Sequence, residues 1–127
     1  MAAHRILVVD DEAPLLRLIS NYVSRAGYEV TCCGSASEVR TLAETEDWDA
    51  AIVDLSLPDS TGAGLLLFLL DRFPHLRLLA SSGGPFDAGT LGEAYRGRTA
   101  FLAKPYLPGD LIAALEALTA RRTPPAK

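Results

Sequence analysis

The chain has 127 residues, of which 49% are hydrophobic and 22% charged, as expected for one globular domain with a single core. Its net charge of -4 and its scattered basic residues, apart from Arg121-Arg122, argue against direct nucleic-acid binding. The first residues of the sequence lack the charged region and the small-residue cleavage site of a signal peptide, and no apolar stretch approaches the ~20 residues that span a bilayer. We therefore expect a cytoplasmic protein with no membrane partner, with one domain over 1–122 and a C-terminal tail or the start of a linker at 123–127.

Short apolar runs alternate with segments of helical spacing five times along the chain. In chain order we expect strand 6–9, helix 13–26, strand 29–33, a helix from the capping pattern at 35–38 to about 45, strand 50–54, helix 63–73, strand 76–82, a weak helix 88–96, strand 99–103 and helix 109–121. Such an alternation is typical of an α/β fold with a parallel sheet.

Local signals mark several of these boundaries. Gly27 follows the first helix where a left-handed cap is expected. Ser35 and Glu38 form a capping-box pattern at the start of the second helix. Pro74 ends the third helix, because proline cannot continue the hydrogen-bond ladder. The adjacent pair Cys32-Cys33 lies in a strand, so the two thiols should point to opposite faces and stay reduced.

Three expected strands, at 6–9, 50–54 and 76–82, are nearly continuous apolar runs. Parallel strands that are covered by helices on both faces have this pattern. We therefore predict an α/β fold with a doubly wound, five-stranded parallel sheet and helices on both faces. The glycine-rich segment 83–92 makes the fourth helix the weakest element, because each interior glycine costs up to ~1 kcal/mol of helix stability.

Polar residues of a particular kind follow four of the apolar runs. Asp10-Asp11 follows the first strand, Asp54 ends the third, Ser82 ends the fourth, and Lys104 follows the fifth. Because the carboxyl ends of parallel strands lie along one edge of the sheet, we expect these side chains to meet in one pocket. Clustered carboxylates bind Mg²⁺, and a lysine and a hydroxyl suit phosphate oxygens. The pattern therefore predicts a site for a divalent cation and a phosphoryl group together.

Four short motifs occur at these strand ends in a specific order. They are Val8-Val-Asp-Asp-Glu12, Asp54-Leu-Ser-Leu-Pro58 with Gly62, Ser82-Gly83, and Lys104-Pro105, the last two placed 22 residues apart. In order and spacing the chain resembles the receiver domain of two-component response regulators, from about residue 5 to residue 121. The resemblance implies a flavodoxin-like (βα)5 fold with strand order 2-1-3-4-5, and a receiver domain over 1–122.

The resemblance implies a Mg²⁺ site at the acidic residues. Asp11 and Asp54 would be direct ligands, Asp10 would act mostly through water, and the backbone carbonyl of Ser56 would be a third protein ligand. This is chemically reasonable, because Mg²⁺ takes a few carboxylates and completes its octahedron with waters and phosphate oxygens. A simpler interpretation is that Asp10 and Asp11 cap the first helix and that Asp54 is a turn residue.

The reacting groups are also implied by the resemblance. Asp54 would be the phosphoacceptor, with Lys104 neutralising charge on the transferring group. Ser82 would donate a hydrogen bond to the new phosphoryl oxygen; Ser81 is the alternative hydroxyl, and the distance to Lys104 along the chain favours Ser82. Phe101 would be the aromatic switch, whose ring turns inward when that hydroxyl moves, although an aromatic residue in this strand can equally belong to the core.

The implied function is a phosphoacceptor signalling module of a two-component phosphorelay, which catalyses only its own phosphorylation and dephosphorylation. A histidine kinase or a histidine phosphotransfer protein would supply the phosphoryl group. The fourth helix, fifth strand and last helix would form the switching surface, which would contact an effector domain or output protein, or a second copy of the chain in a homodimer.

Other classes of function fit the sequence less well. A receiver-like interaction module that signals without phosphate is the main alternative, although Asp11, Asp54 and Lys104 are all present. A Mg²⁺-dependent phosphatase with an aspartyl nucleophile would need an Asp-x-Asp spacing where this chain has Asp10-Asp11-Glu12. A flavin-binding flavodoxin would need a phosphate-cradling loop there, and the two aspartates would repel that phosphate.

Overall fold

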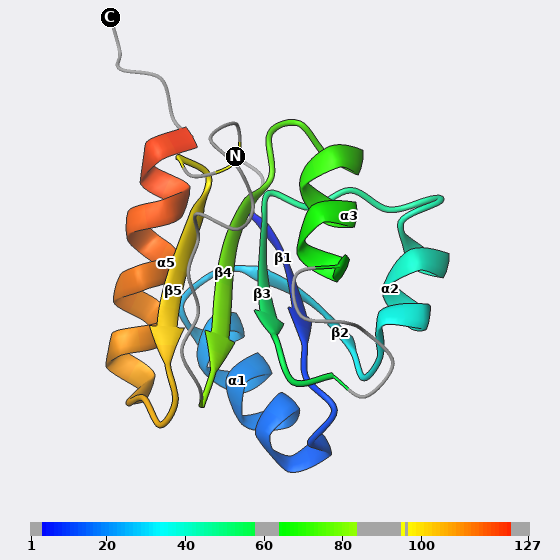
Figure 1. Ribbon diagram of the computed structural model, residues 1–127. Coiled ribbons are helices and arrows are strands. Elements are labelled where there is room, and N and C mark those ends of the chain that lie inside the picture. The colour runs from blue at the N-terminus through cyan, green and yellow to red at the C-terminus, as the bar shows by residue number, and fades with distance from the viewer. Residues whose placement is uncertain (1–3, 58–63, 84–94, 96, 123–127) are drawn as a thin grey trace, which may run out of the picture.

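Five strands form the centre of the protein in a computed structural model (Figure 1). The structure describes residues 4–57, 64–83, 95 and 97–122, with side chains as far as residue 119. Its elements are β1 (Arg5–Val9), α1 (Ala13–Arg25), β2 (Glu29–Cys33), α2 (Ala36–Leu42), β3 (Ala50–Asp54), α3 (Gly64–Arg72), β4 (Arg77–Ser82), β5 (Thr99–Ala103) and α5 (Pro108–Arg122). Within these ranges, no helix combines the length and the apolar character that crossing a bilayer requires.

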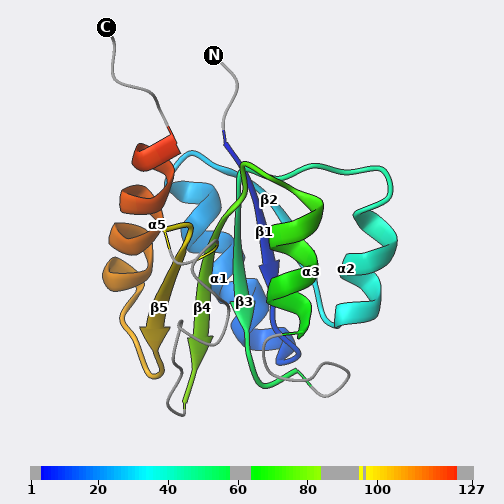
Figure 2. The same ribbon diagram turned by 45° about the horizontal axis from the view of Figure 1, so that its top comes forward.

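The strands lie in the order β2-β1-β3-β4-β5, and every neighbouring pair is parallel. Helices α1 and α5 cover one face of the sheet, and α2 and α3 cover the other (Figure 1, Figure 2). This confirms the doubly wound α/β fold and the predicted strand order. The helix expected at 88–96 lies outside the described residues, except for Tyr95, which is helical.

The observed bounds differ from the expected ones by a few residues. Helix α2 ends at Leu42 rather than near residue 45, because the amides of Glu44 and Thr45 bond to carbonyls only three residues back and tighten the chain into turns. Strand β4 begins at Arg77 rather than Leu76, because the Leu76 amide is already bonded within the preceding turn. Periodicity does not reveal either of these local bonds.

The strands contribute alternate side chains to two separate apolar cores. The core under α2 and α3 contains, from the central strands, Leu7, Val9, Ala51, Val53, Leu78 and Ala80. The core under α1 and α5 contains Ile6, Val8, Ala50, Ile52 and Leu79. Strands β1, β3 and β4 are therefore apolar on both faces, as their sequences indicate. On β2, Cys33 is buried and Cys32 exposed, and both thiols are free.

Two of the local signals operate as expected. Gly27 has a φ of 101°, in the left-handed region, and follows the end of α1. At the start of α2, the Glu38 amide donates to Ser35 Oγ over 3.2 Å. The Glu38 carboxylate accepts a bond of 2.7 Å from the amide of Gly34, one residue before the position that a standard capping box uses.

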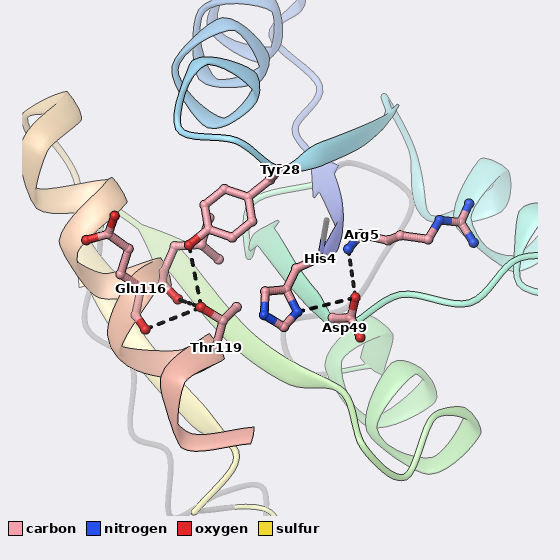
Figure 3. Close-up of polar contacts among 7 residues, drawn as sticks. His4, Arg5, Tyr28, Asp49, Glu116 and Thr119 are labelled. Atoms are coloured by element: carbon pink, nitrogen blue, oxygen red, sulfur yellow. Dashed lines mark hydrogen bonds and ion pairs between the residues drawn. The ribbon is translucent and has the colours of Figure 1, made fainter. Parts of the chain in front are cut away.

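Polar contacts join the elements at the amino-terminal edge of the sheet (Figure 3). The Arg5 amide donates to Asp49 Oδ2 over 2.7 Å, and the His4 imidazole lies 3.6 Å from the same oxygen. On the α5 side, Tyr28 Oη and Thr119 Oγ1 are 3.5 Å apart. The first contacts tie the start of β1 to the segment that leads into β3, and the last one ties the segment that leads into β2 to the last helix.

Arg98 holds the carboxyl end of α3 against the turn that precedes β5. Its guanidinium donates to three backbone carbonyls at the end of α3 and in the turn that follows it. They belong to Leu70, Phe73 and Leu76, at 3.2, 2.6 and 3.1 Å. It also lies 5.9 Å from the centre of the Tyr95 ring. A planar guanidinium can serve several carbonyls at once, which an ammonium on a flexible chain cannot.

We predict that Arg98→Lys lowers the free energy of unfolding by about 2 kcal/mol, because the charge is kept while the three-carbonyl arrangement is lost. Urea denaturation followed by circular dichroism measures the change. Arg25→Lys, at the exposed end of α1, is the matched control and should leave stability within about 0.5 kcal/mol. An equal effect of both substitutions would contradict this role of Arg98.

Candidate functional site

The sheet brings the predicted polar residues to one edge. Asp10 directly follows β1, and Asp54 is the last residue of the neighbouring strand β3. Ser82 ends β4 and pairs with the last residue of β5, which directly precedes Lys104. Because all four strands run in the same direction, these residues leave the sheet on the same side. The sheet topology therefore places the ends of these four strands at one edge, as the sequence predicts.

An ammonium group lies between two buried carboxylates at this edge. Lys104 Nζ is 3.3 Å from Asp10 Oδ2 and 3.4 Å from Asp54 Oδ2. Asp10 is 2% exposed and Asp54 is 4% exposed. Carboxylates are buried to this extent only when they are paired or hydrogen-bonded, and the lysine is paired with both of them.

The second oxygen of each buried carboxylate binds the backbone. Asp10 Oδ1 accepts a bond of 3.0 Å from the Glu12 amide, and Asp54 Oδ1 accepts one of 3.0 Å from the Ser56 amide. These bonds, two residues ahead in both cases, fix the loops after β1 and β3. The N-cap of α1 is Glu12, whose own side chain makes no capping bond. Asp10 therefore binds the backbone of the N-cap residue and is not itself the cap. The simpler interpretation of the acidic pair as helix caps does not account for this geometry.

Asp11 completes an acidic cluster with the two buried residues. One carboxylate oxygen from each of Asp10, Asp11 and Asp54 lies within 4.8 Å of the others, and Asp11 is exposed at the surface. Carboxylate oxygens are the ligands that hard divalent cations such as Mg²⁺ prefer, and an exposed ligand leaves room for waters and phosphate oxygens. The donor set therefore fits the metal that the sequence predicts.

The charges around Lys104 alter its titration. Burial lowers the pKa of the lysine, but attraction to Asp10 and Asp54 outweighs this effect, and the pKa is raised above its ordinary value. The stabilisation from this group is therefore fully present below the ordinary lysine pKa and is lost only as the pH rises through the raised value. The ammonium remains charged throughout the neutral range.

Two serines on β4 and an aromatic residue on β5 lie on the strands that lead to this edge. Ser81 is buried, whereas Ser82 is partly exposed and its carbonyl accepts a bond of 2.9 Å from the Lys104 amide. This placement agrees with the preference for Ser82 as the reactive hydroxyl, which stays a prediction. Phe101 is 36% exposed on β5, so its ring does not belong to either core as described.

A cleft opens beside Lys104 that the sequence analysis did not anticipate. It has a volume of about 450 Å³, and the described residues that line it are Leu15, Gly83, Lys104, Pro105 and Tyr106. An aromatic residue two positions after Lys104 is the only sequence signal for it, because Leu15 comes from α1 and reaches the cleft through the fold. The lining is mostly apolar, in contrast to the charged group next to it.

We predict that Lys104→Met destabilises the metal-free protein by about 2 kcal/mol, because two buried carboxylates then lack their cation. Adding Asp54→Asn to this variant should recover part of the loss, since one of the repelling charges is removed. Urea denaturation in the presence of a chelator measures both. Arg17→Met, on the exposed face of α1, is the control; a double variant less stable than Lys104→Met would contradict the repulsion.

The solved structures that resemble this one include receiver domains. The CheY-like receiver domain protein of Methanospirillum hungatei JF-1 has a TM-score of 0.82 at 25% identity, over 95% of this chain and 97% of that one. Chemotaxis protein CheY4 of Vibrio cholerae has a TM-score of 0.81 at 25% identity, over 92% and 99%. The fold and the site thus define an α/β domain of the CheY-like class.

The model of the response regulator receiver domain family matches residues 6–116, and the chain belongs to that family. The transcriptional regulatory protein GltR of Pseudomonas aeruginosa is 32% identical, over 91% of this chain and 49% of its own length. The sensory/regulatory protein RpfC of Xanthomonas campestris is 34% identical, over 85% and 15%. The chain therefore spans half or less of the length of these curated relatives.

Proposed function

We propose that the protein is the phosphoacceptor module of a two-component phosphorelay and that Asp54 receives the phosphoryl group. The observation that carries the proposal is the setting of Asp54. Its carboxylate is buried, lies 3.4 Å from the Lys104 ammonium, and has two further carboxylates within 4.8 Å. Membership of the receiver family supports a histidine kinase or a histidine phosphotransfer protein as the donor.

The transfer requires little of the protein beyond position and charge. One Asp54 oxygen forms a bond to phosphorus while the bond from phosphorus to the donor breaks, and the leaving atom keeps that electron pair. Lys104 lies close enough to Asp54 to neutralise charge that develops on the transferring group. The Ser56 amide keeps the carboxylate in one orientation through its bond to Oδ1.

The acidic cluster would hold Mg²⁺. Asp11 and Asp54 would be direct ligands together with the Ser56 carbonyl, and Asp10, which is already bonded to Lys104 and to the Glu12 amide, would act through water. When bound, the cation supplies positive charge against the phosphoryl oxygens. It also relieves the mutual repulsion of the three carboxylates.

Phosphorylation would be communicated through Ser82 and Phe101. The phosphoryl group adds a charge of about -2 at pH 7, and the Ser82 hydroxyl would move to donate to it. The ring of Phe101, exposed in this structure, would then turn inward and change the surface that includes β5 and α5. That surface would contact an effector domain, an output protein or a second copy of the chain.

The principal alternative is a receiver-like interaction module that works without phosphate. The buried pairing of Asp54 with Lys104 favours phosphate control, because burying charged groups is unfavourable and an interaction surface does not require it. Under the proposal the protein turns over no substrate other than its own aspartyl phosphate. We assign the module to residues 1–122 and to the cytoplasm, with 123–127 as a tail or linker.

We predict that acetyl phosphate and Mg²⁺ add one acid-stable, base-labile phosphoryl group, and that Asp54→Asn abolishes the labelling, because an amide is not a nucleophile here. Intact mass spectrometry measures the added mass. Asp47→Asn, at an exposed aspartate before β3, is the matched control and should be labelled normally. Undiminished labelling of Asp54→Asn would assign the phosphate to another residue, and an unlabelled natural sequence would favour the interaction module.

Mg²⁺ should stabilise the folded protein, because it binds only where the three carboxylates are brought together. At ten times its dissociation constant the cation adds about 1.4 kcal/mol. Thermal melting with and without Mg²⁺ measures this, and Asp11→Ala should lose most of the shift. Glu12→Ala, which removes an adjacent carboxylate outside the cluster, should keep it. Equal shifts in both variants would exclude Asp11 as a ligand.

A further inference from the structure

A small cavity lies at the amino edge of the sheet, at the opposite end of the strands from Asp54 (Figure 1). Its volume is about 210 Å³, and the described residues that line it are Pro74, His75, Arg77 and Arg98. Three of these four side chains are of basic types, and none of the four is acidic. The lining is mostly polar, in contrast to the cleft at the carboxyl edge.

The pairing of two strands brings the arginines together. Arg77 is the first residue of β4, and Arg98 directly precedes β5. The residues that follow them, Leu78 and Thr99, are partners in the parallel register. Arg77 Nη1 donates to the carbonyl of Gly97 over 3.1 Å, so its guanidinium lies against the residue just before Arg98. Both guanidiniums are therefore at the turn that leads into β5.

The Arg98 guanidinium is held in one position. Its bonds to the three carbonyls around the end of α3 come from Nε and Nη2. Nη1 makes no bond to a residue that the structure describes, so its donors are left over after the guanidinium has been anchored. A side chain that is already fixed loses little conformational freedom when it binds a ligand.

Positive charge is concentrated around this cavity. Burial lowers the pKa of Arg98, and the charge of Arg77 lowers it further against the smaller effects of Tyr95 and Asp71. Asp71 accepts a hydrogen bond from the Tyr95 hydroxyl and is not among the residues that line the cavity. Both guanidiniums stay charged in the neutral range, because arginine does not lose its proton there. An anion between them would replace repulsion by attraction.

We propose that this cavity binds a phosphate-class oxyanion, as inorganic phosphate or as the phosphate of a monoester, between Arg77 and Arg98. The imidazole of His75, which is exposed, would be a further donor. Guanidinium groups match the oxygens of phosphate with paired hydrogen bonds. The cavity is smaller than the roughly 300–1,000 Å³ of sites for drug-sized ligands, so it suits one small group. The site is separate from Asp54 and does not rest on the proposed function.

NMR titration of the natural sequence tests the assignment, with a chelator present and the ionic strength held constant with chloride. Phosphate should give saturable shifts of the backbone amides at 75–78 and 97–99. Acetate, with one charge and fewer oxygens, should bind at least about tenfold more weakly. Arg77→Gln should weaken phosphate binding about tenfold or more, which corresponds to the loss of one hydrogen bond between charged groups.

Two further variants separate this role from a general effect of charge. Arg25→Gln makes the same change at the exposed end of α1 and should leave phosphate binding unaltered. His75→Ala lies in the turn before β4, outside the sheet, and should weaken binding about threefold. It tests the site independently of Arg77, whose substitution touches the first residue of a strand.

A second titration, with glycerol 3-phosphate, distinguishes the two sources of the anion. Tighter binding of the monoester than of phosphate supports the site and identifies its ligand as a phosphorylated molecule. Equal or weaker binding of the monoester, with saturable binding of phosphate, supports the site and identifies the free ion as its ligand. Both readings require the shifts to lie at the amino edge.

Three results would overturn the inference. Phosphate shifts that never saturate, or that saturate only around Lys104, would mean that the cavity binds no oxyanion. Equal affinities for acetate and phosphate would exclude a phosphate-class ligand. Equal weakening by Arg77→Gln and Arg25→Gln would mean that only the net charge matters. None of these results bears on Asp54, because its labelling by acetyl phosphate is measured separately.

Discussion

The pairing of Lys104 with Asp10 and Asp54 is the interaction on which the rest of the site depends. Lys104 follows β5, whereas the two carboxylates follow β1 and end β3, so the lysine side chain must reach across the end of β4. The end of β4 carries only small residues, which leave room for the lysine side chain: Ser81, Ser82 and Gly83. A bulky side chain there would separate the ammonium from the carboxylates, and two buried charges would lose their partner.

Sequence patterns predict the fold and the meeting of the strand ends because both follow from local rules. Apolar runs identify β1, β3 and β4, and polar residues at their ends must share an edge once the strands are parallel. The same patterns cannot predict that Asp10 is buried while Asp11 is exposed, or that Arg98 binds three carbonyls. Those facts depend on contacts between elements distant in the chain, as does the placement of Tyr106 in a cleft with Leu15.

The two edges of the sheet differ in how fully their polar groups are paired. At the carboxyl edge, three carboxylates crowd together within 4.8 Å, and the repulsion lowers stability when no further cation is bound. At the amino edge, Asp49 accepts a bond from the Arg5 amide, and Arg98 satisfies the carbonyls after α3. The hydrogen bonds at the amino edge thus offset the loss of stability that carboxylate repulsion causes at the carboxyl edge. Proteins commonly lose some stability at a functional site and recover it elsewhere.

The separation of the two cores by the sheet also affects how the surface of this domain can vary. Among the described residues, the buried side chains under α2 and α3 form one cluster and those under α1 and α5 another, since the strands send alternate residues to each layer. Substitutions that are far apart and share no neighbours have nearly additive effects on stability. Each helical layer can therefore acquire substitutions, and with them new recognition properties, while the opposite layer keeps its packing and its own partners.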